Sequence, residues 1–380
     1  MALPLPERNV IIIMKFTVST KPLKTAVGLA VVDKNVNKYY QRSILIQLSA
    51  DKTDLTINTE SNSIFSEVNL KGTGDGEPAV VLLDSLLFKQ LISTINTPQV
   101  TIDFTDNGIT IIAGKSTYSL PKLMDSDEIK LESPDTVDNL DEATDIDKNG
   151  WKFIKEHQLF AKATSTTNPV YTYVWTGDSD VLVGDYVNSL FTHSESGQLE
   201  KPCLLSESII NLLVSMPDDA KIIAKDDTYV ISVKSDSYEY TSQFKPLYES
   251  DDNGNYNAEM ILSLMPSDDD KGIIINGDEI ISALNQSLLL ADTKIHNIQF
   301  SVDSEGVRIK DNRVDCFIAP ENKVDTDAYT LTFNPNVLKS VISACPESIV
   351  KICPTVADDE VVGIAVVDKS MTVVLGGLEE

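Results

Sequence analysis

The sequence predicts an α+β fold made of three tandem, similar domains, each with two helices packed on antiparallel sheets. One reason is a pattern of helix, turn and strand that occurs three times, in Leu82–Phe104, Leu204–Ala224 and Leu331–Ile352. A second is that runs of alternating apolar residues, typical of half-buried strands, surround each copy. A third is that the copies lie about 120–130 residues apart, the usual size of one domain.

The three copies agree in detail, which favours an internal repeat over three unrelated amphipathic helices. Each helix is preceded by a residue that caps helices well, namely Asp84, Ser206 or Asn334. The apolar face expected for the first helix consists of Leu86, Leu87, Leu91, Ile92 and Ile95.

Composition limits the class of protein. With 42% apolar residues, the chain of 380 residues has enough side chains to fill packed cores. No apolar run reaches the ~18 residues of a transmembrane helix, and the N-terminus lacks the features of a secretion signal. The four cysteines and three histidines have no paired metal-ligand spacing, so we expect no metal site and a reducing, cytoplasmic compartment.

The net charge is −27, because 58 acidic residues outnumber 31 basic ones. This charge argues against binding nucleic acid over the whole surface, but it leaves room for a local basic face.

The acidic and polar stretch 125–147 is interpreted as a linker or mobile loop. Met14 opens the first convincing strand. The predicted division is therefore an N-terminal extension (1–13), a first domain (14–124), the acidic linker (125–147), a second domain (148–258) and a third domain (259–380).

In the first domain, Asp106, Asn107 and Gly108 are typical of a hairpin turn, and the glycine-rich stretch 71–78 is expected to be a turn. Besides the repeat helix, the expected elements are a helix at Lys21–Asp33 and strands at Lys15–Ser19, Ile44–Leu48, Asp54–Thr59, Ile64–Leu70, Ala79–Leu83, Val100–Phe104, Gly108–Ala113 and Ser116–Leu120.

The other two domains are expected to follow the same plan. The second has a helix at Gly150–Thr164 and strands at Val170–Trp175, Asp180–Val183, Ser189–Thr192, Lys221–Ala224, Tyr229–Lys234 and Tyr238–Phe244. The third has a helix at Asp278–Asp292 and strands at Ile298–Val302, Val307–Lys310, Asp315–Ile318, Val350–Ile352, Val361–Val367 and Met371–Leu375.

Three such domains in tandem resemble the β sliding clamp of bacterial DNA polymerase III. Four segments look like their counterparts in that family: MKFTVSTKPLKTAV from Met14, STYSLPKL at 116–123, LNQSLLLADTKIHNIQFSVDSEGVRI at 284–309, and MTVVLGGL at 371–378. The resemblance covers nearly the whole chain from Met14 and is weakest in the second domain. It implies a DNA clamp fold and a polymerase processivity factor acting in DNA replication.

The resemblance further implies a head-to-tail homodimer that closes a ring of six domains around duplex DNA, with helices lining the hole. Closure avoids open filaments, and pairing edge strands across protomers covers their exposed edges. By resemblance, Tyr118 and Leu120 of one protomer contact Leu289 and Leu290 of the other. A clamp-loader ATPase is implied as a partner, whereas a cofactor and a catalytic step are not. The expected location is the bacterial cytosol, or the host cytosol for a phage-encoded clamp.

Two binding surfaces are expected. Lysines on the helices would contact phosphates without reading sequence, in a salt-dependent way that permits sliding. The candidate DNA-binding residues are Lys24, Lys34, Lys38, Lys89, Lys152, Lys155, Lys162 and Lys339. By resemblance, polymerase and other partners dock short linear peptides in a hydrophobic cleft between the second and third domains. The candidate cleft residues are Val174, Tyr186, Pro266, Val373 and Leu375.

The cleft departs from the family pattern, because Gly376 and Gly377 replace the usual proline and methionine and the histidine–arginine pair of the second domain is missing. Partner peptides are therefore expected to differ from the common bacterial motif, which would suit a phage-encoded clamp.

Two other classes of function remain open. One is a β-rich repeat protein of a virion or surface, which would not need lysines gathered on helices. The other is an enzyme with a divergent site. The segment GTGDGEP at 72–78 lacks the lysine and following helix of a phosphate-binding loop, and no nucleophile motif is visible.

Overall fold

A computed structural model describes the fold of the chain. The described residues are 14–30, 43–61, 64–123, 131, 133–135, 142–152, 154–155, 173–177, 180–184, 188–193, 199, 201–248, 256–266, 271–291, 296–323, 326–345, 347–357, 360–369 and 371–378. The chain forms two compact units. The first consists of Met1–Ile146 and Ser215–Pro246, and the second of Asp147–Val214 and Leu247–Glu380.

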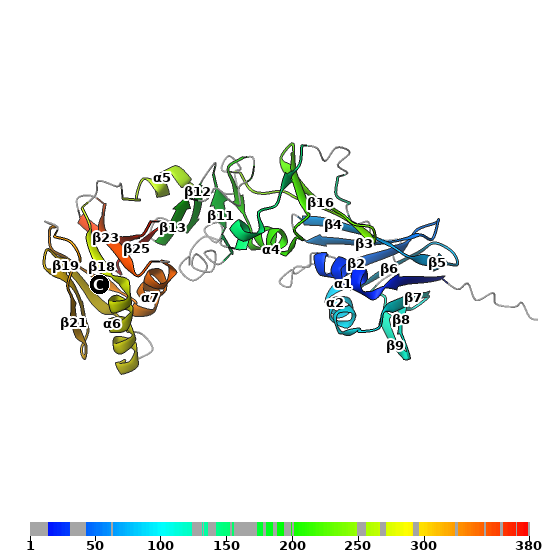
Figure 1. The fold of residues 1–380 in the computed structure, drawn as a ribbon, viewed down its shortest axis with the longest axis horizontal. Helices are drawn as coiled ribbons and strands as arrows, with labels where there is room; N and C mark the ends of the chain where they lie inside the picture. The colour runs from blue at the N-terminus through cyan, green and yellow to red at the C-terminus, as the bar shows by residue number, and fades with distance from the viewer. Residues whose placement is uncertain are drawn as a thin grey trace, which may run out of the picture. The chain divides into compact units, whose positions relative to one another are not determined.

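The first unit contains two antiparallel sheets (Figure 1). The five-stranded sheet has the order β5-β1-β7-β8-β9, and the eight-stranded sheet has the order β10-β15-β16-β17-β4-β3-β2-β6. The strands are β1 Met14–Ser19, β2 Ser43–Leu48, β3 Asp54–Ser61, β4 Ile64–Lys71, β5 Thr73–Asp75, β6 Ala79–Asp84, β7 Gln99–Thr105, β8 Gly108–Ala113, β9 Ser116–Pro121, β10 Thr144–Asp145, β15 Lys221–Lys225, β16 Thr228–Lys234 and β17 Tyr238–Phe244.

Two helices of this unit, α1 (Thr20–Leu29) and α2 (Ser85–Thr94), lie against each other and bury one face each. The predicted cap is confirmed, because the backbone N–H of Leu87 donates to Asp84 Oδ1 at 2.8 Å. The first helix was expected to reach Asp33, but it ends at Leu29 because the backbone of Ala30 leaves the helical region.

The buried face of α2 differs from the expected one. Phe88 and Ile92 are buried, whereas Leu86 is 36% and Leu87 is 52% exposed. Phe88 fills the space beneath the helix, and the two leucines before it are turned towards solvent. The prediction that Leu86 and Leu87 belong to the core face was therefore wrong.

The second unit also contains two antiparallel sheets (Figure 1). The eight-stranded sheet has the order β14-β11-β12-β13-β25-β24-β23-β18, and the four-stranded sheet has the order β21-β20-β19-β22. The strands are β11 Val174–Thr176, β12 Asp180–Gly184, β13 Asn188–His193, β14 Cys203–Leu205, β18 Ile273–Asn276, β19 Ile298–Asp303, β20 Gly306–Lys310, β21 Asp315–Ile318, β22 Tyr329–Phe333, β23 Ile349–Ala357, β24 Glu360–Val367 and β25 Met371–Gly376.

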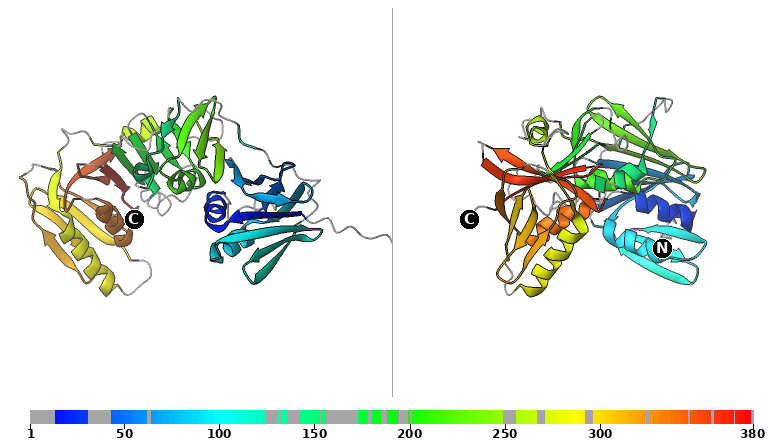
Figure 2. Two further views of the ribbon diagram at one scale, coloured as in Figure 1. Left: turned by 45° about the vertical axis from the view of Figure 1, so that its right-hand side comes forward. Right: turned by 60° about the vertical axis from the view of Figure 1, so that its left-hand side comes forward.

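The helices of this unit are α5 (Ala258–Leu262), α6 (Gly277–Leu290) and α7 (Pro335–Ala344), together with residues 148–152 and 154–155. Figure 2 shows α6 and α7 side by side, and they share one core with both sheets. The second repeat helix, α4 (Glu207–Ser215), begins in this unit, and its last residue falls in the first. The predicted caps are confirmed: Ile209 N–H donates to Ser206 Oγ at 3.4 Å, and Asn336 N–H donates to Asn334 Oδ1 at 2.9 Å.

The repeat is visible in the element order, because each copy is a strand, a helix and then three strands. These runs are β6-α2-β7-β8-β9, β14-α4-β15-β16-β17 and β22-α7-β23-β24-β25. The hairpin that joins β7 to β8 matches the one that joins β19 to β20. Both hairpins need glycine, because φ is 141° at Gly108 and 155° at Gly306. In addition, a Cβ at either position would lie within 2.3 Å of a carbonyl oxygen of the next strand.

Long-range pairing adds strands that the local pattern did not predict, namely β5, β10, β14, β18 and β22. The glycine-rich stretch expected as a turn contains β5, which pairs with β1. In the acidic linker, Asp135 forms an ion pair with Lys225 at 3.1 Å, and Asp145 forms one with Lys221. At these points the linker contacts the eight-stranded sheet.

Among the described residues, no helix is long and apolar enough to cross a membrane, and no three histidine, cysteine or acidic side chains are grouped to hold a metal ion.

Candidate functional site

The candidate lysines lie on helices of both units. Lys152 and Lys155 are exposed on the helical segment at the start of the second unit, whereas Lys339 on α7 is half-buried. Lys24 on α1 is also half-buried, and its Nζ lies 3.5 Å from Asn96 Oδ1. Lys34, Lys38 and Lys162 lie outside the described residues.

Lys89 on α2 has a partner within the fold. Its Nζ donates to the carbonyl oxygens of Gly28, at 3.5 Å, and of Ala30, at the C-terminal end of α1. A cation at this end of a helix is stabilised by the unpaired carbonyls and by the helix dipole. Lys89 therefore joins the two helices, and a phosphate would have to compete with these carbonyls for its ammonium.

The sheet edge formed by β9 is open in the first unit. This strand is exposed along its length apart from Leu120, which is half-buried, and it pairs only with β8 among the described strands. Tyr118 and Leu120 lie opposite Ile111 and Ile109, which are buried, so they extend the core face of the sheet to its edge. Tyr118 is nevertheless 38% exposed.

The edge formed by β21 is open in the second unit in the same way. Cys316 lies opposite the buried Ile309 and packs towards α6, where its Sγ is 3.7 Å from Gln286 Oε1. At the end of α6, Leu289 is 85% and Leu290 is 44% exposed. Phe317, on the other face of β21, is 53% exposed and was not singled out from the sequence.

Three polar side chains fix the end of α6 to the turn that precedes β21. Ser287 Oγ donates to Asp311 Oδ2 at 2.5 Å, and His296 Nε2 lies 2.7 Å from Ser287 Oγ and 3.0 Å from Asp311 Oδ2. The other carboxylate oxygen of Asp311 accepts the backbone N–H groups of Arg313 and Val314, at 2.6 and 2.7 Å. The guanidinium of Arg313 donates to the carbonyl oxygen of Leu290 at 3.0 Å.

This cluster, Ser287–His296–Asp311, positions the open edge rather than performing acyl transfer. In a catalytic triad, the carboxylate and the nucleophile occupy opposite nitrogens of the imidazole, whereas here both meet the same Nε2. Ser287 is also fully buried. Burial acts to raise the pKa of Asp311, but hydrogen bonds from Ser287, the two amides and His296 outweigh it and hold that pKa below its usual value.

The candidate cleft residues are mostly covered. Val174, Val373 and Leu375 are buried within the eight-stranded sheet of the second unit, where β13 pairs with β25. Tyr186 lies outside the described residues. Pro266 is half-buried and lines a pocket of about 630 Å³.

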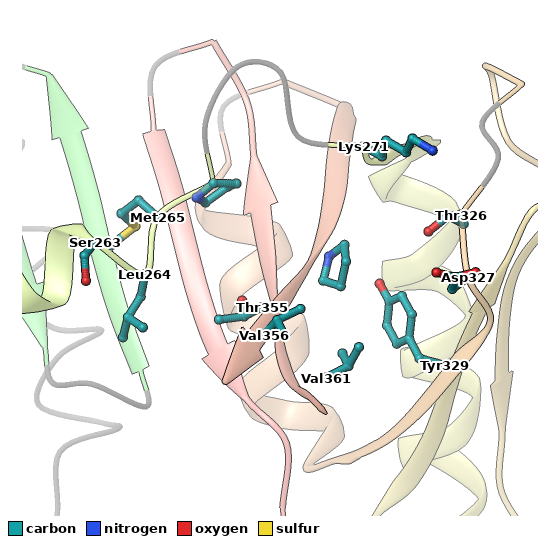
Figure 3. Close-up of a pocket in the computed structure, with 12 residues that line it drawn as sticks. Ser263, Leu264, Met265, Lys271, Thr326, Asp327, Tyr329, Thr355, Val356 and Val361 are labelled. Atoms are coloured by element: carbon teal, nitrogen blue, oxygen red, sulfur yellow. The ribbon is translucent and has the colours of Figure 1, made fainter. Parts of the chain in front are cut away.

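Segments distant in sequence form this pocket (Figure 3). Thr355, Val356 and Val361 lie between Leu264 and Met265 on one side and Asp327 and Tyr329 on the other. The volume of the pocket lies within the range of ligand-binding pockets, although polar groups make up much of its lining. Neither Thr355 nor Tyr329 was singled out from the sequence.

Comparison with known proteins shows that the chain is similar to bacterial sliding clamps in sequence and in fold. No protein-family model matches it. The β sliding clamp of Bacillus subtilis is 24% identical over 345 residues, which cover 86% of this chain and 89% of that protein. The crystal structure of the DNA polymerase sliding clamp from Bacillus subtilis matches with a TM-score of 0.72 and 18% identity, over 97% of this chain and 99% of that one.

Other solved structures are similar to this chain in fold. A putative DNA polymerase III β subunit from Eubacterium rectale matches with a TM-score of 0.73 and 15% identity, over 97% of this chain and 100% of that one. The Helicobacter pylori β clamp, bound to a DNA ligase peptide, matches with a TM-score of 0.65 and 14% identity, over 96% and 100%. These likenesses confirm the predicted α+β fold and the resemblance stated from the sequence.

Proposed function

We propose that this chain, which has the fold of bacterial β sliding clamps and resembles one of them over most of its length, is a DNA sliding clamp. As a homodimeric ring of three domains per chain (14–124, 148–258 and 259–380), it would encircle duplex DNA. It would tether a replicative polymerase in the cytoplasm, without a cofactor or a catalytic step. A clamp-loader ATPase would open the ring.

The observation that carries this proposal is the pair of open sheet edges. Each eight-stranded sheet consists of two four-stranded halves joined edge to edge, at β17-β4 and at β13-β25. The five-stranded and four-stranded sheets lack such a joint, and β9 and β21 each form one of their two edges. Pairing β9 of one protomer with β21 of the next would add the missing joint and protect both edges from unspecific association.

Apolar side chains support the same contact. Tyr118 and Leu120 bring the core face of one sheet to its edge, and Leu289 and Leu290 stand beside the other edge. We propose that these side chains continue the core across the interface. Because the patches on the two sheets differ, the contact is head-to-tail, and two such contacts close a dimeric ring.

For the DNA surface, we propose that Lys24, Lys152, Lys155 and Lys339 act together with Lys34, Lys38, Lys89 and Lys162. The chain has a net charge of −27, so lysines on helices would attract phosphate locally. The rest of the surface is acidic and would repel DNA that lies outside the ring.

For partner binding, two similar clamps are informative. The Helicobacter pylori clamp is bound to a DNA ligase peptide, and a clamp from Bartonella birtlesii is bound to griselimycin. We propose that this chain also binds linear peptides in the region of Val174, Tyr186, Pro266, Val373 and Leu375. Val174, Val373 and Leu375, which are buried, would pack beneath the surface of the cleft rather than contact the peptide.

Retention on DNA of defined topology tests the function. The protein is loaded on nicked circular DNA with a bacterial clamp loader and ATP, and the complex is gel-filtered at high salt, where phosphate contacts are weak. We expect the protein to elute with the circle and to be released when a restriction enzyme linearises it. Loss from the circle itself, or retention that survives linearisation, would refute a sliding clamp.

A further inference from the structure

The fold covers most of its sheet edges and leaves two of them open. An edge strand carries N–H and C=O groups that can bond to a strand of another chain. In the described part of the chain, five edges share backbone hydrogen bonds with a segment outside their sheet, and β10 offers an edge of only two residues. The covered edges are those of β5, bonded to Lys52, β6, bonded to Leu123, β14, bonded to Leu247, β18, bonded to Glu321, and β22, bonded to Leu378. Among the described strands of four residues or more, only β9 and β21 end a sheet without such a segment.

At the edge of β18, a side chain supplies most of the cover. The backbone N–H of Glu321 donates to the carbonyl oxygen of Ile274 at 2.8 Å. Asn322 adds two bonds from its carboxamide, because Oδ1 accepts the backbone N–H of Ile274 at 2.7 Å and Nδ2 donates to the carbonyl oxygen of Gly272 at 3.2 Å. Gly272 and Ile274 are two residues apart, and alternate residues of a strand direct their backbone groups to the same edge. The carboxamide of Asn322 therefore occupies the positions at which a neighbouring strand would bond.

The residues of β18 make this edge prone to pairing with another chain. The strand has the sequence IIIN, in which Ile273 and Ile275 are buried and Ile274 is half-buried. Charged side chains and proline are common means of blocking an edge strand, and β18 contains neither. Without the cover, this end of the eight-stranded sheet would present an apolar, uncharged strand with free backbone groups.

We propose that Asn322 determines the specificity of assembly, because its carboxamide closes the β18 edge and so confines strand pairing between copies of this chain to β9 and β21. Two copies that paired through β18 would form one continuous sheet by a contact between identical edges. Such a contact would join one ring to another without closing either. The inference goes beyond the proposed function, since it concerns the edges that stay closed and involves neither DNA nor a partner protein.

Asn322→Ala tests the proposal. It removes two of the three bonds, so the fraction of molecules with an uncovered β18 edge should rise about 25-fold, or about fivefold for each bond. Hydrogen exchange of the Ile274 amide reports this fraction and should become faster by about the same factor. Light scattering over a dilution series should show no species above two chains for the wild type and an added species of four chains for the variant. A wild-type mass of one chain would refute the ring contact, and the variant would then be compared as two chains against one.

Two further variants separate edge pairing from general destabilisation. Asn322→Asp keeps an oxygen that accepts the N–H of Ile274 and adds a charge to the edge, so it should keep the wild-type mass although it loses the bond to Gly272. Asn336→Ala is the matched control, because Asn336 is exposed on α7 and lies on no sheet edge. The proposal would be overturned by unchanged exchange at Ile274 in Asn322→Ala, by a wild-type mass of that variant at every concentration, or by equal association of Asn322→Asp or Asn336→Ala.

Discussion

Replacing Leu289 and Leu290 by alanine tests the proposed ring contact most directly. Each substitution removes three carbon atoms, worth roughly 2.4 kcal/mol when fully buried. Leu289 is now 85% exposed and Leu290 44% exposed, and only these exposed parts would become buried at an interface. The carbon atoms that the two substitutions remove would therefore contribute about 3 kcal/mol to each contact. A ring has two such contacts, so the dissociation constant should rise by about four powers of ten.

The assay is solution mass by light scattering across a dilution series. The wild-type protein should have the mass of two chains and the variant that of one, with the melting temperature of the separated chain unchanged, because both leucines are exposed in it. The matched control is Leu86→Ala/Leu87→Ala, an exposed pair on α2, which should leave the dimer intact. A double variant of Leu289 and Leu290 that dimerises like the wild type, or a control that falls apart equally, would refute the reasoning.

Two further predictions concern single side chains. Burial raises the pKa of Cys203 to about 11, so at pH 8 iodoacetamide should label the half-buried Cys316 well before Cys203. Dimer formation should slow the labelling of Cys316. Mass spectrometry that finds Cys203 labelled first would contradict this prediction. Because the pKa of Asp311 is lowered by folding, its charge stabilises the fold above about pH 4, and this contribution is lost as the pH falls through the folded value. Asp311→Asn should therefore lower the free energy of unfolding by about 1–3 kcal/mol at pH 7 and by less at about pH 3. Urea titrations measure this free energy, and an equal loss at both pH values would show that the charge of Asp311 is not responsible.

The features that local sequence determines were predicted well. A capping residue acts within one turn of its helix, so Asp84, Ser206 and Asn334 could be identified by residue type and spacing alone. The face of α2 was harder, because Leu86, Leu87 and Phe88 are consecutive apolar residues and periodicity alone does not decide which of them faces the sheet.

Of the residues that line the pocket, only Pro266 was singled out from the sequence. Pro266, Tyr329 and Thr355 come from three segments, and pairing within two different sheets brings them together. Nothing near Thr355 in the chain indicates that its hydroxyl is buried, since this depends on what packs over it. The short strand β5 was missed for a similar reason, because it is stabilised by pairing with β1 rather than by its own residues. β18 pairs with β23, but its three isoleucines are typical of a strand, so residue type alone could have indicated it.

The joint between β17 and β4 has a consequence for synthesis on the ribosome. Ser66 and Ser242, which approach within 3.1 Å across it, are 176 residues apart in the chain. At roughly 5–20 residues per second, β4 waits about 10–35 s after it leaves the ribosome before its neighbour is made. During that time β4 can pair with β3, but its other edge stays open in the nascent chain, and an open strand edge is a site for aggregation.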